Sequence, residues 1–391
     1  MITTGISPLG INWNVIVNNS PVDARHINRV TIDYAENTHD IATVDFVGTP
    51  SVIIADYLDK PVAISMVVGG GINQSFFGYI KNIDAASVTS IGLIDSSPFQ
   101  VMRAICFGAS YFLKETNNRI WNNVTLFDIV QQIANPYRMS YSVPNDSFKF
   151  ARIVQNKNTN WEFLVKVCNQ LGYRVSCHGT HIHVWDPLKA LAHQPSYTII
   201  RGLLGKNKNY TPSPGDIIKF EPVIGTHTIS GANTTNSVGY VTPEGTVGTV
   251  SNYDLPLSET YINDNPIQTN QTLSINAQSF EMAQRIVTAE KLNQSFSYHA
   301  HVEIMSDPSI VPGGIVKVEG YGNNFDGYWY VNKVVHELVS ESMLSNISIS
   351  KNTPDDNFDK FPKVKKYKFA PEPILLNNRW VAQTEYADVY A

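Results

Sequence analysis

Charged side chains are scarce in this sequence, and so is any excess of positive charge. Lys, Arg, Asp and Glu make up 16% of the 391 residues, so the surface must rely on neutral polar side chains. Lys plus Arg number 29 against 34 for Asp plus Glu, which gives a formal net charge of −5. No overall positive field therefore draws the protein to nucleic acid or to an anionic membrane, and any such contact has to be local.

Cysteine and long apolar runs are scarce as well. The three cysteines, Cys106, Cys168 and Cys177, are an odd number without CxxC spacing, which favours buried free thiols over a disulfide or zinc framework. No apolar run is long enough to span a bilayer, and residues 1–10 lack the basic and apolar regions of a signal peptide. These absences predict a protein made in a cytoplasm, with no membrane contact.

The sequence is rich instead in short stretches with the alternation of half-buried strands. Residues 11–95 contain several of them, separated by turn residues, which is typical of a small antiparallel barrel or sandwich. Further along the chain, residues 315–318 and 328–335 predict a β-hairpin, flanked by strands at 298–304 and 344–349. We therefore expect a second group of antiparallel strands to close around this hairpin.

Helical signals lie between these two groups of strands. Thr125 and Thr159 each precede an apolar face at helical spacing and have an acidic residue three positions later, Asp128 and Glu162 respectively. This is the pattern of a capping box, in which the hydroxyl accepts a bond from the first turn and the carboxylate returns one. A third helix is predicted over 276–293, with Asn276 as its N-cap.

Seven short segments between about residues 60 and 350 form a pattern that is seen in a known family. They are Phe77-Gly78-Tyr79-Ile80, Asn158-Thr-Asn-Trp-Glu-Phe-Leu164, Leu171-Gly172-Tyr173, Val184-Trp185-Asp186-Pro187, Val311-Pro312-Gly313, Gly327-Tyr328-Trp329 and Val334-Val335-His336. With these segments the chain resembles the baseplate hub proteins of phage tails, the late-control D family, which also supplies the base of type VI secretion spikes. One departure is at Val167-Cys168, where a Leu-Ala pair is commoner in the family.

The resemblance implies an α+β, mainly β fold with two tail-tube-like antiparallel β-barrel domains, a helical α/β insertion and an extended C-terminal arm. On this basis residues 1–97 form the first barrel and 98–200 the middle α/β domain. Residues 201–350, with helix 276–293, form the second barrel, and 351–391 form the arm. The Gly-, Asn- and Thr-rich stretch 201–275 has few apolar runs, so we expect strands linked by long surface loops there.

The resemblance also implies a structural function without catalysis. Such a hub is a homotrimer whose two barrels per subunit make a quasi-sixfold ring, which adapts a hexameric tail tube to a trimeric central spike. The implied partners are the protein itself, a tail-tube or distal tail protein, the spike and baseplate wedge proteins, with DNA only passing through the lumen. The implied location is the virion baseplate, assembled in the bacterial cytoplasm.

A cell-wall hydrolase carried on a tail is the alternative function. Against it, the matched segments leave only about 40 residues, which is well below the size of a domain. No serine lies in a GxSxG setting, and no arrangement of nucleophile and base emerges.

Two motifs that suggest chemistry are incomplete. The run 69–71 is glycine throughout, but Gln74 replaces the last glycine of a dinucleotide fingerprint and strands follow it. His336-Glu337 begins like the zinc motif HExxH, yet Ser340 stands where the second histidine ligand is needed, in a segment that alternates as a strand. Neither motif predicts a site.

Cys177, His178, His181 and His183 are the one cluster with ligand-type atoms, placed around a predicted hairpin. They lack the tight paired spacing of structural zinc, and exposed strand faces often carry histidine. We interpret the cluster as structural and metal-free. The sequence thus names no catalytic, cofactor-binding or metal-binding residue.

The arm, 351–391, combines lysines, aromatic residues and prolines that exclude a continuous helix or central strand. Its lysines between 360 and 368 alternate with aromatics, as in arms that bind single-stranded nucleic acid, but the overall acidity favours a solvated linker or a protein-docking tail. The apolar side chains after Pro373 would be exposed on a free tail, so we predict that they bind a neighbouring subunit or the spike. These residues are Ile374, Leu375, Leu376, Trp380, Tyr386 and Tyr390.

Overall fold

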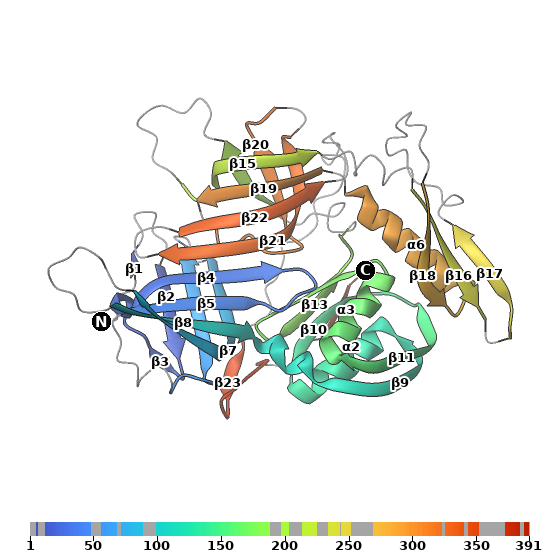
Figure 1. The fold of residues 1–391 in the computed structure, drawn as a ribbon, viewed down its shortest axis with the longest axis horizontal. Helices are drawn as coiled ribbons and strands as arrows, with labels where there is room; N and C mark the ends of the chain where they lie inside the picture. The colour runs from blue at the N-terminus through green and yellow to red at the C-terminus, as the bar shows by residue number, and fades with distance from the viewer. Residues whose placement is uncertain are drawn as a thin grey trace.

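The computed structural model is made mainly of β-strands, with a group of helices to one side (Figure 1). It describes residues 5–6, 12–47, 56–68, 72–88, 99–187, 197–202, 213–224, 234–242, 244–251, 269–296, 298–305, 307–322, 325–339, 343–351, 372–383 and 387–390. No helix in these ranges is long and apolar enough to cross a membrane. The Gly69 to Gly71 run and the lysines between 360 and 368 lie outside them.

The first barrel is a curled sheet in the order β2-β6-β7-β8-β5-β4. Along β4 buried and less buried residues alternate, as the period of two in the sequence predicted, and the buried side chains fill a core that contains Tyr34, Phe46 and Phe76. Its strands are β1 Gly5–Ile6, β2 Asn12–Val17, β3 Ser20–Pro21, β4 Ile27–Ala35, β5 Ile41–Val47, β6 Pro61–Val68, β7 Ile72–Val88 and β8 Phe99–Gly108. The 3-10 turn η1 is Ala24–His26.

The second barrel is closed. Its strands follow the order β14-β20-β21-β22-β19-β15, and β15 returns to pair with β14. The predicted hairpin is β20–β21, and its fully buried Trp329 belongs to the core of this barrel. The strands are β14 Tyr197–Gly202, β15 Asp216–Ile224, β19 Tyr298–Met305, β20 Ile315–Glu319, β21 Gly327–Val339 and β22 Met343–Lys351.

The two barrels have the same connectivity. When the six strands of each barrel are numbered along the chain, both follow the spatial order 1-4-5-6-3-2. Both also have a β-bulge at matching places, at Lys81 and Asn332 in the fifth strand and at Asn28 and Ile218 in the second. They differ in the first strand, because β2 is antiparallel to β6 whereas β14 is parallel to β20. The first barrel has no pairing between β2 and β4 within the described residues.

One continuous antiparallel sheet runs through both barrels, and we call it the continuous sheet. Its order is β7-β8-β5-β4-β21-β22-β19-β15, with β7 and β15 at opposite ends (Figure 1). The barrels join where β4 pairs with residues 333–339 of β21. Two ion pairs cross this junction, from Lys333 to Asp33 at 2.6 Å and from Arg29 to Glu337 at 3.3 Å.

The middle domain packs two helices against small sheets. Both predicted capping boxes are present: the Thr125 hydroxyl accepts from the Asp128 N–H, and the Thr159 hydroxyl from the Glu162 N–H. The helices are α2 Leu126–Ala134 and α3 Asn160–Gln170, with 3-10 turns η2 Ala109–Lys114 and η3 Asn135–Tyr137. The strands are β9 Thr116–Thr125, β10 Ser140–Pro144, β11 Lys149–Thr159, β12 Arg174–His178 and β13 His181–Trp185.

The segment between β15 and β19 forms a subdomain of its own. Strands β16 Thr234–Val241, β17 Val247–Ser251 and β18 Thr269–Ala277 make a sheet that contacts helix α6 Phe280–Ser295. Its buried residues Val238 and Ile286 belong to the same core as the middle domain, not to that of the second barrel. Sequence analysis placed this segment within the second barrel, because a shared core between distant segments leaves no local signal.

Two other boundaries differ from those expected. The N-cap of α6 is Ser279, whose hydroxyl accepts from the Met282 N–H, so the cap lies three residues after the predicted Asn276. Strand β8 follows the expected domain boundary at 97, yet it belongs to the first barrel because it pairs with β5 and β7.

The C-terminal arm crosses from the first barrel to the middle domain. Its hairpin consists of β23 Ile374–Leu376 and β24 Arg379–Val381, and Asn377 and Asn378 both have positive φ in the turn, as a tight hairpin requires. The last strand, β25 Ala387–Tyr390, pairs in parallel with β10. The predicted extended arm is therefore confirmed, and the described part of it contacts its own chain.

Candidate interaction surfaces

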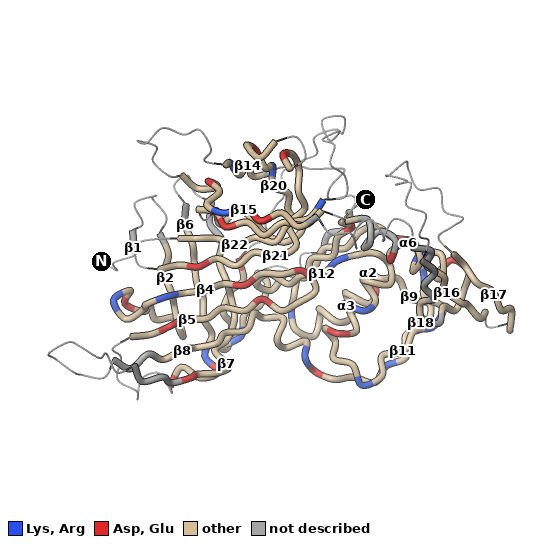
Figure 2. Tube along the Cα trace, turned by 45° about the horizontal axis from the view of Figure 1, so that its top comes forward, with Lys and Arg blue, Asp and Glu red and all other residues tan. Residues whose placement is uncertain are grey.

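The outward face of the continuous sheet is polar. On β4, Val30, Ile32 and Tyr34 point into the core, so the residues between them point the other way. Figure 2 shows acidic and basic residues interspersed along β4, β5, β21 and the strands beside them. A face with both signs of charge is solvated, unlike the mostly apolar lining of a small-molecule pocket.

The buried charge of Asp45 on this face is neutralised by neighbouring arginines. The Asp45 carboxylate is 5% exposed and accepts two hydrogen bonds from Arg103, at 2.8 and 3.1 Å, while Arg29 Nε lies 3.4 Å away. The hydrogen bonds to Asp45 raise the pKa of Arg103. Such a bidentate pair fixes two neighbouring strands, β5 and β8, and leaves no charge poised for proton transfer.

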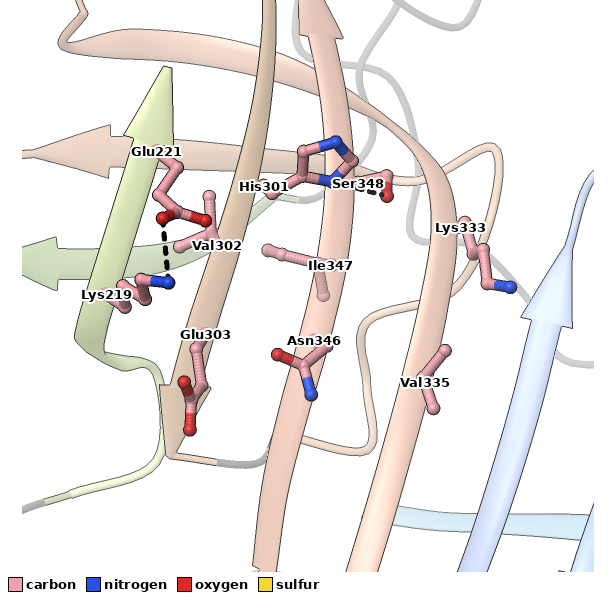
Figure 3. Close-up of a pocket in the computed structure, with 10 residues that line it drawn as sticks. All are labelled: Lys219, Glu221, His301, Val302, Glu303, Lys333, Val335, Asn346, Ile347 and Ser348. Atoms are coloured by element: carbon pink, nitrogen blue, oxygen red, sulfur yellow. Dashed lines mark hydrogen bonds and ion pairs between the residues drawn. The ribbon is translucent and has the colours of Figure 1, made fainter. Parts of the chain in front are cut away.

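A shallow hollow lies on the same face over the second barrel (Figure 3). Its volume is about 300 Å³, and its polar lining includes a Lys219–Glu221 ion pair of 2.7 Å on β15 and the exposed side chain of His301 on β19. The His301 Nδ1 and Ser348 Oγ atoms are 3.2 Å apart. The hollow is a curved stretch of sheet surface rather than an enclosed active site.

The structure places five of the six arm residues that were predicted to bind a partner, on strands β23, β24 and β25. Ile374 and Leu376, each 44% exposed, and the half-buried Leu375 lie on β23. Trp380 is half-buried on β24, and Tyr390 lies on β25 beside Pro144 of β10. Tyr386 lies outside the described residues.

Trp380 binds its own chain at the boundary of the first barrel and the middle domain. Its indole N–H donates to the Gly78 carbonyl at 3.0 Å, and its backbone N–H donates to the Tyr79 hydroxyl at 2.6 Å. The ring contacts Phe77 edge to face, with centroids 4.9 Å apart. The Phe77-Gly78-Tyr79 segment, which carried part of the family resemblance, is therefore the receptor for this side chain.

The four residues of the cysteine and histidine cluster do not converge on one point. Cys177 is buried in the middle-domain core, and burial raises the pKa of its thiol. His181 and His183 both contact the Ser142 hydroxyl, at 2.9 and 2.7 Å. Within the described residues no group of three or more His, Cys, Asp or Glu is placed to hold a metal ion.

His178, the fourth member, faces a different domain. Its Nδ1 lies 2.9 Å from the buried carboxylate of Asp40, which precedes β5 in the first barrel. Burial alone would lower the pKa of His178, but the charge of Asp40 and this hydrogen bond outweigh burial and raise it. The pair holds the middle domain against the first barrel.

The predicted state of the cysteines is confirmed: Cys106, Cys168 and Cys177 are buried free thiols. The incomplete zinc motif lies on strand β21, where His336 is fully buried and its Nδ1 is 2.7 Å from Ser345 Oγ. Burial lowers the pKa of His336 to about 4, so its imidazole is neutral at pH 7.

Sequence reasoning missed the continuous sheet as a surface. The alternation that buries Val30 and Ile32 also turns the half-buried Arg29, Thr31 and Asp33 outward, so the sequence did contain a signal for a polar face of the first barrel. The pairing of β4 with β21 had no signal, because it joins residues about 300 positions apart in the chain.

No family model matches the chain, and no curated protein matches it by sequence. Solved structures do match. A tail protein from Neisseria meningitidis MC58 has a TM-score of 0.63 at 11% identity, covering 88% of this chain and 98% of that one. The 43 kDa tail protein of prophage MuSo2 from Shewanella oneidensis has a TM-score of 0.61 at 12% identity, covering 88% and 100%.

A component of the Escherichia coli type VI secretion system, itself described as similar to tail proteins of phage T4, has a TM-score of 0.52 at 12% identity. The match covers 90% of this chain and 78% of that one. At such identities the likeness establishes the fold. This chain therefore has the fold of phage tail proteins and of type VI secretion spike-related proteins, which is the fold that its resemblance to the baseplate hub family predicted.

Proposed function

We propose that the protein is a structural baseplate hub of a phage tail or related injection machine. It forms a homotrimer whose barrels make a quasi-sixfold ring, which adapts a hexameric tail tube on one side to a trimeric spike on the other. The observation that carries this proposal is the repeat of one barrel within one sheet, with the same strand order and matching bulges. A chain with two equivalent barrels presents six similar units when three copies form a closed ring.

The polar face of the continuous sheet supports the same function. If the sheet lines the ring, this face borders the lumen through which DNA passes. Paired charges such as Asp45 with Arg103 suit passage, because they offer no net positive site to hold a phosphate backbone. The tube, the spike and baseplate wedge proteins then contact the rims of the ring, and the protein is located in the virion tail.

The exposed part of the arm hairpin is proposed to bind a partner. Ile374 and Leu376 expose apolar surface on β23 while the neighbouring strand holds Trp380 against its own chain. A hairpin anchored on one side presents its other residues at a fixed place, which lowers the entropy lost on binding. A neighbouring subunit or the spike is the partner that we expect there.

The mass of the purified full-length protein tests the proposed function. Analytical ultracentrifugation at high micromolar concentration, with the spike protein also present, should give a trimer, and electron microscopy should show a ring. A strictly monomeric mass under both conditions would refute the hub. Release of soluble fragments from purified peptidoglycan would instead favour the alternative, a tail-associated cell-wall hydrolase.

A further inference from the structure

Because the two barrels repeat the same strand order, each strand at the junction between them has an equivalent strand in the other barrel. The bulges at Lys81 and Asn332 align β7 with β21, so residues 82–88 correspond to 333–339. The bulges at Asn28 and Ile218 align β4 with β15, so residues 29–34 correspond to 219–224. The β4–β21 junction therefore has a counterpart in the pair β15 and β7, which lie at the two ends of the continuous sheet (Figure 1).

Beyond their bulges, each of these two end strands pairs with another described strand along one edge only. Beyond its bulge β21 pairs with β22 on one edge and with β4 on the other. Residues 82–88 of β7 pair with β8, and no strand in the described part of the chain pairs with their other edge. Residues 219–224 of β15 likewise pair only with β19 among the described strands, because β14 reaches only Asp216 and Ile217.

Unpaired edges carry backbone donors and acceptors that readily take another strand. Both edge strands also carry solvent-exposed side chains. Asp84 on β7 is exposed, and on β15 Ile218 and Val223 are 47% and 50% exposed. The edge strand β15 therefore combines exposed apolar side chains with the charged pair Lys219–Glu221 and with Pro222, which limit pairing with unrelated strands but leave apolar surface for a specific one. The two edges lie at opposite ends of the continuous sheet, so the edge of one chain can pair with the other kind of edge in a second copy.

We propose that β15 of one copy pairs antiparallel with residues 82–88 of β7 in the next copy, in the register of the junction inside the chain. That junction places Asp33 opposite Val335, and the equivalent residues are Val223 and Asp84. The contact between subunits thus repeats the contact within them and closes the sheet into a ring. The inference rests on the proposed trimer and names the surfaces that build it.

The junction within the chain and the proposed junction between copies differ at one residue, Pro222 of β15. The Glu36 N–H donates to the Asn332 carbonyl, so alternate N–H groups of β4, including that of Ile32, point to β21. Pro222 is the counterpart of Ile32 and has no N–H, so the contact between copies has one hydrogen bond fewer than the contact within the chain. Proline at this edge also opposes pairing with unrelated strands before assembly.

Cysteine cross-linking of the full-length protein tests this register. Asp33 and Val335 form a pair without mutual hydrogen bonds, as the alternation from Glu36 requires, and such pairs have Cα atoms about 4.5 Å apart, within the range for a disulfide. The variant D84C/V223C should therefore give covalent trimers under mild oxidation. Mixing the single variants D84C and V223C should give covalent dimers, and neither alone should. The native cysteines are buried and should not interfere.

Two variants are matched controls. D33C/V335C is the same pair within the chain and should form a disulfide without any gain in mass. D84C/E221C is displaced by two residues from the proposed register and should cross-link far less than D84C/V223C. A trimeric mass without cross-linking of D84C/V223C, or with equal cross-linking of D84C/E221C, would overturn the edge pairing and leave the proposed function intact. A monomeric mass would overturn both.

Discussion

Replacing Trp380 by alanine should release the C-terminal arm from the body of the protein. The change removes the indole hydrogen bond to Gly78, whose carbonyl lies in a buried stretch of β7, and the edge-to-face contact with Phe77. A buried acceptor left without its donor costs about 1–3 kcal/mol, and the aromatic pair contributes about 0.5–1.5 kcal/mol beyond its buried area. Together these give about 2–4 kcal/mol of lost arm docking.

Limited proteolysis measures this loss, because cleavage follows the population of the open arm when opening is fast. A loss of about 2–4 kcal/mol corresponds to cleavage of the arm about 30-fold to 1,000-fold faster than in the unmodified protein, at about 1.4 kcal/mol per factor of ten. Trp380→Phe keeps the ring and loses only the N–H donor, so its effect should be intermediate. Circular dichroism should show folded barrels in both variants.

The matched control is Ile374→Ala, on the opposite strand of the same hairpin. Its side chain is 44% exposed, so its removal should leave arm cleavage within about twofold of the unmodified protein, as for an ordinary surface substitution. If Trp380→Ala were cleaved no faster than Ile374→Ala, the arm would be held by other contacts and the reasoning would be wrong. Weaker spike binding or trimerisation of Ile374→Ala would support its proposed role toward a partner.

Three further predictions concern Gly78, His336 and the cysteine and histidine cluster. Gly78→Ala should lower the melting temperature severely or prevent folding, because its Cβ would lie 2.3 Å from the Phe107 carbonyl oxygen; a melting curve equal to that of the parent would contradict this. Burial lowers the pKa of His336 from 6.5 to about 4, so its contribution to the free energy of unfolding is present above pH 6.5 and is lost as the pH falls toward 4. Urea unfolding should lose about 2 kcal/mol from this group by pH 5, and His336→Asn should make that loss smaller. Purified protein should contain no stoichiometric zinc by elemental analysis; zinc that disappears in the double variant His181→Ala/His183→Ala would overturn the structural interpretation of the cluster.

The sequence alone determined the features whose signals lie within a few residues. The capping boxes at Thr125 and Thr159 are formed by side chains three positions apart, and the alternation in 315–339 marks the hairpin. The apolar residues of the arm were also visible, because a run such as Ile374 to Leu376 among prolines and polar residues has no local partner.

Tertiary structure decided which of these elements meet. Strand β8 was missed, and the subdomain containing α6 was assigned to the wrong core, because both assignments depend on distant partners. Trp380 could be chosen as an anchor from its size, but its receptor at Gly78 is about 300 residues away. The continuous sheet arises in the same way, since strand pairing uses backbone groups that every residue carries. Backbone groups are the same in almost every residue, so they do not specify which strands pair. The register of β4 with β21 is fixed only when the cores of both barrels have packed and oriented these two strands.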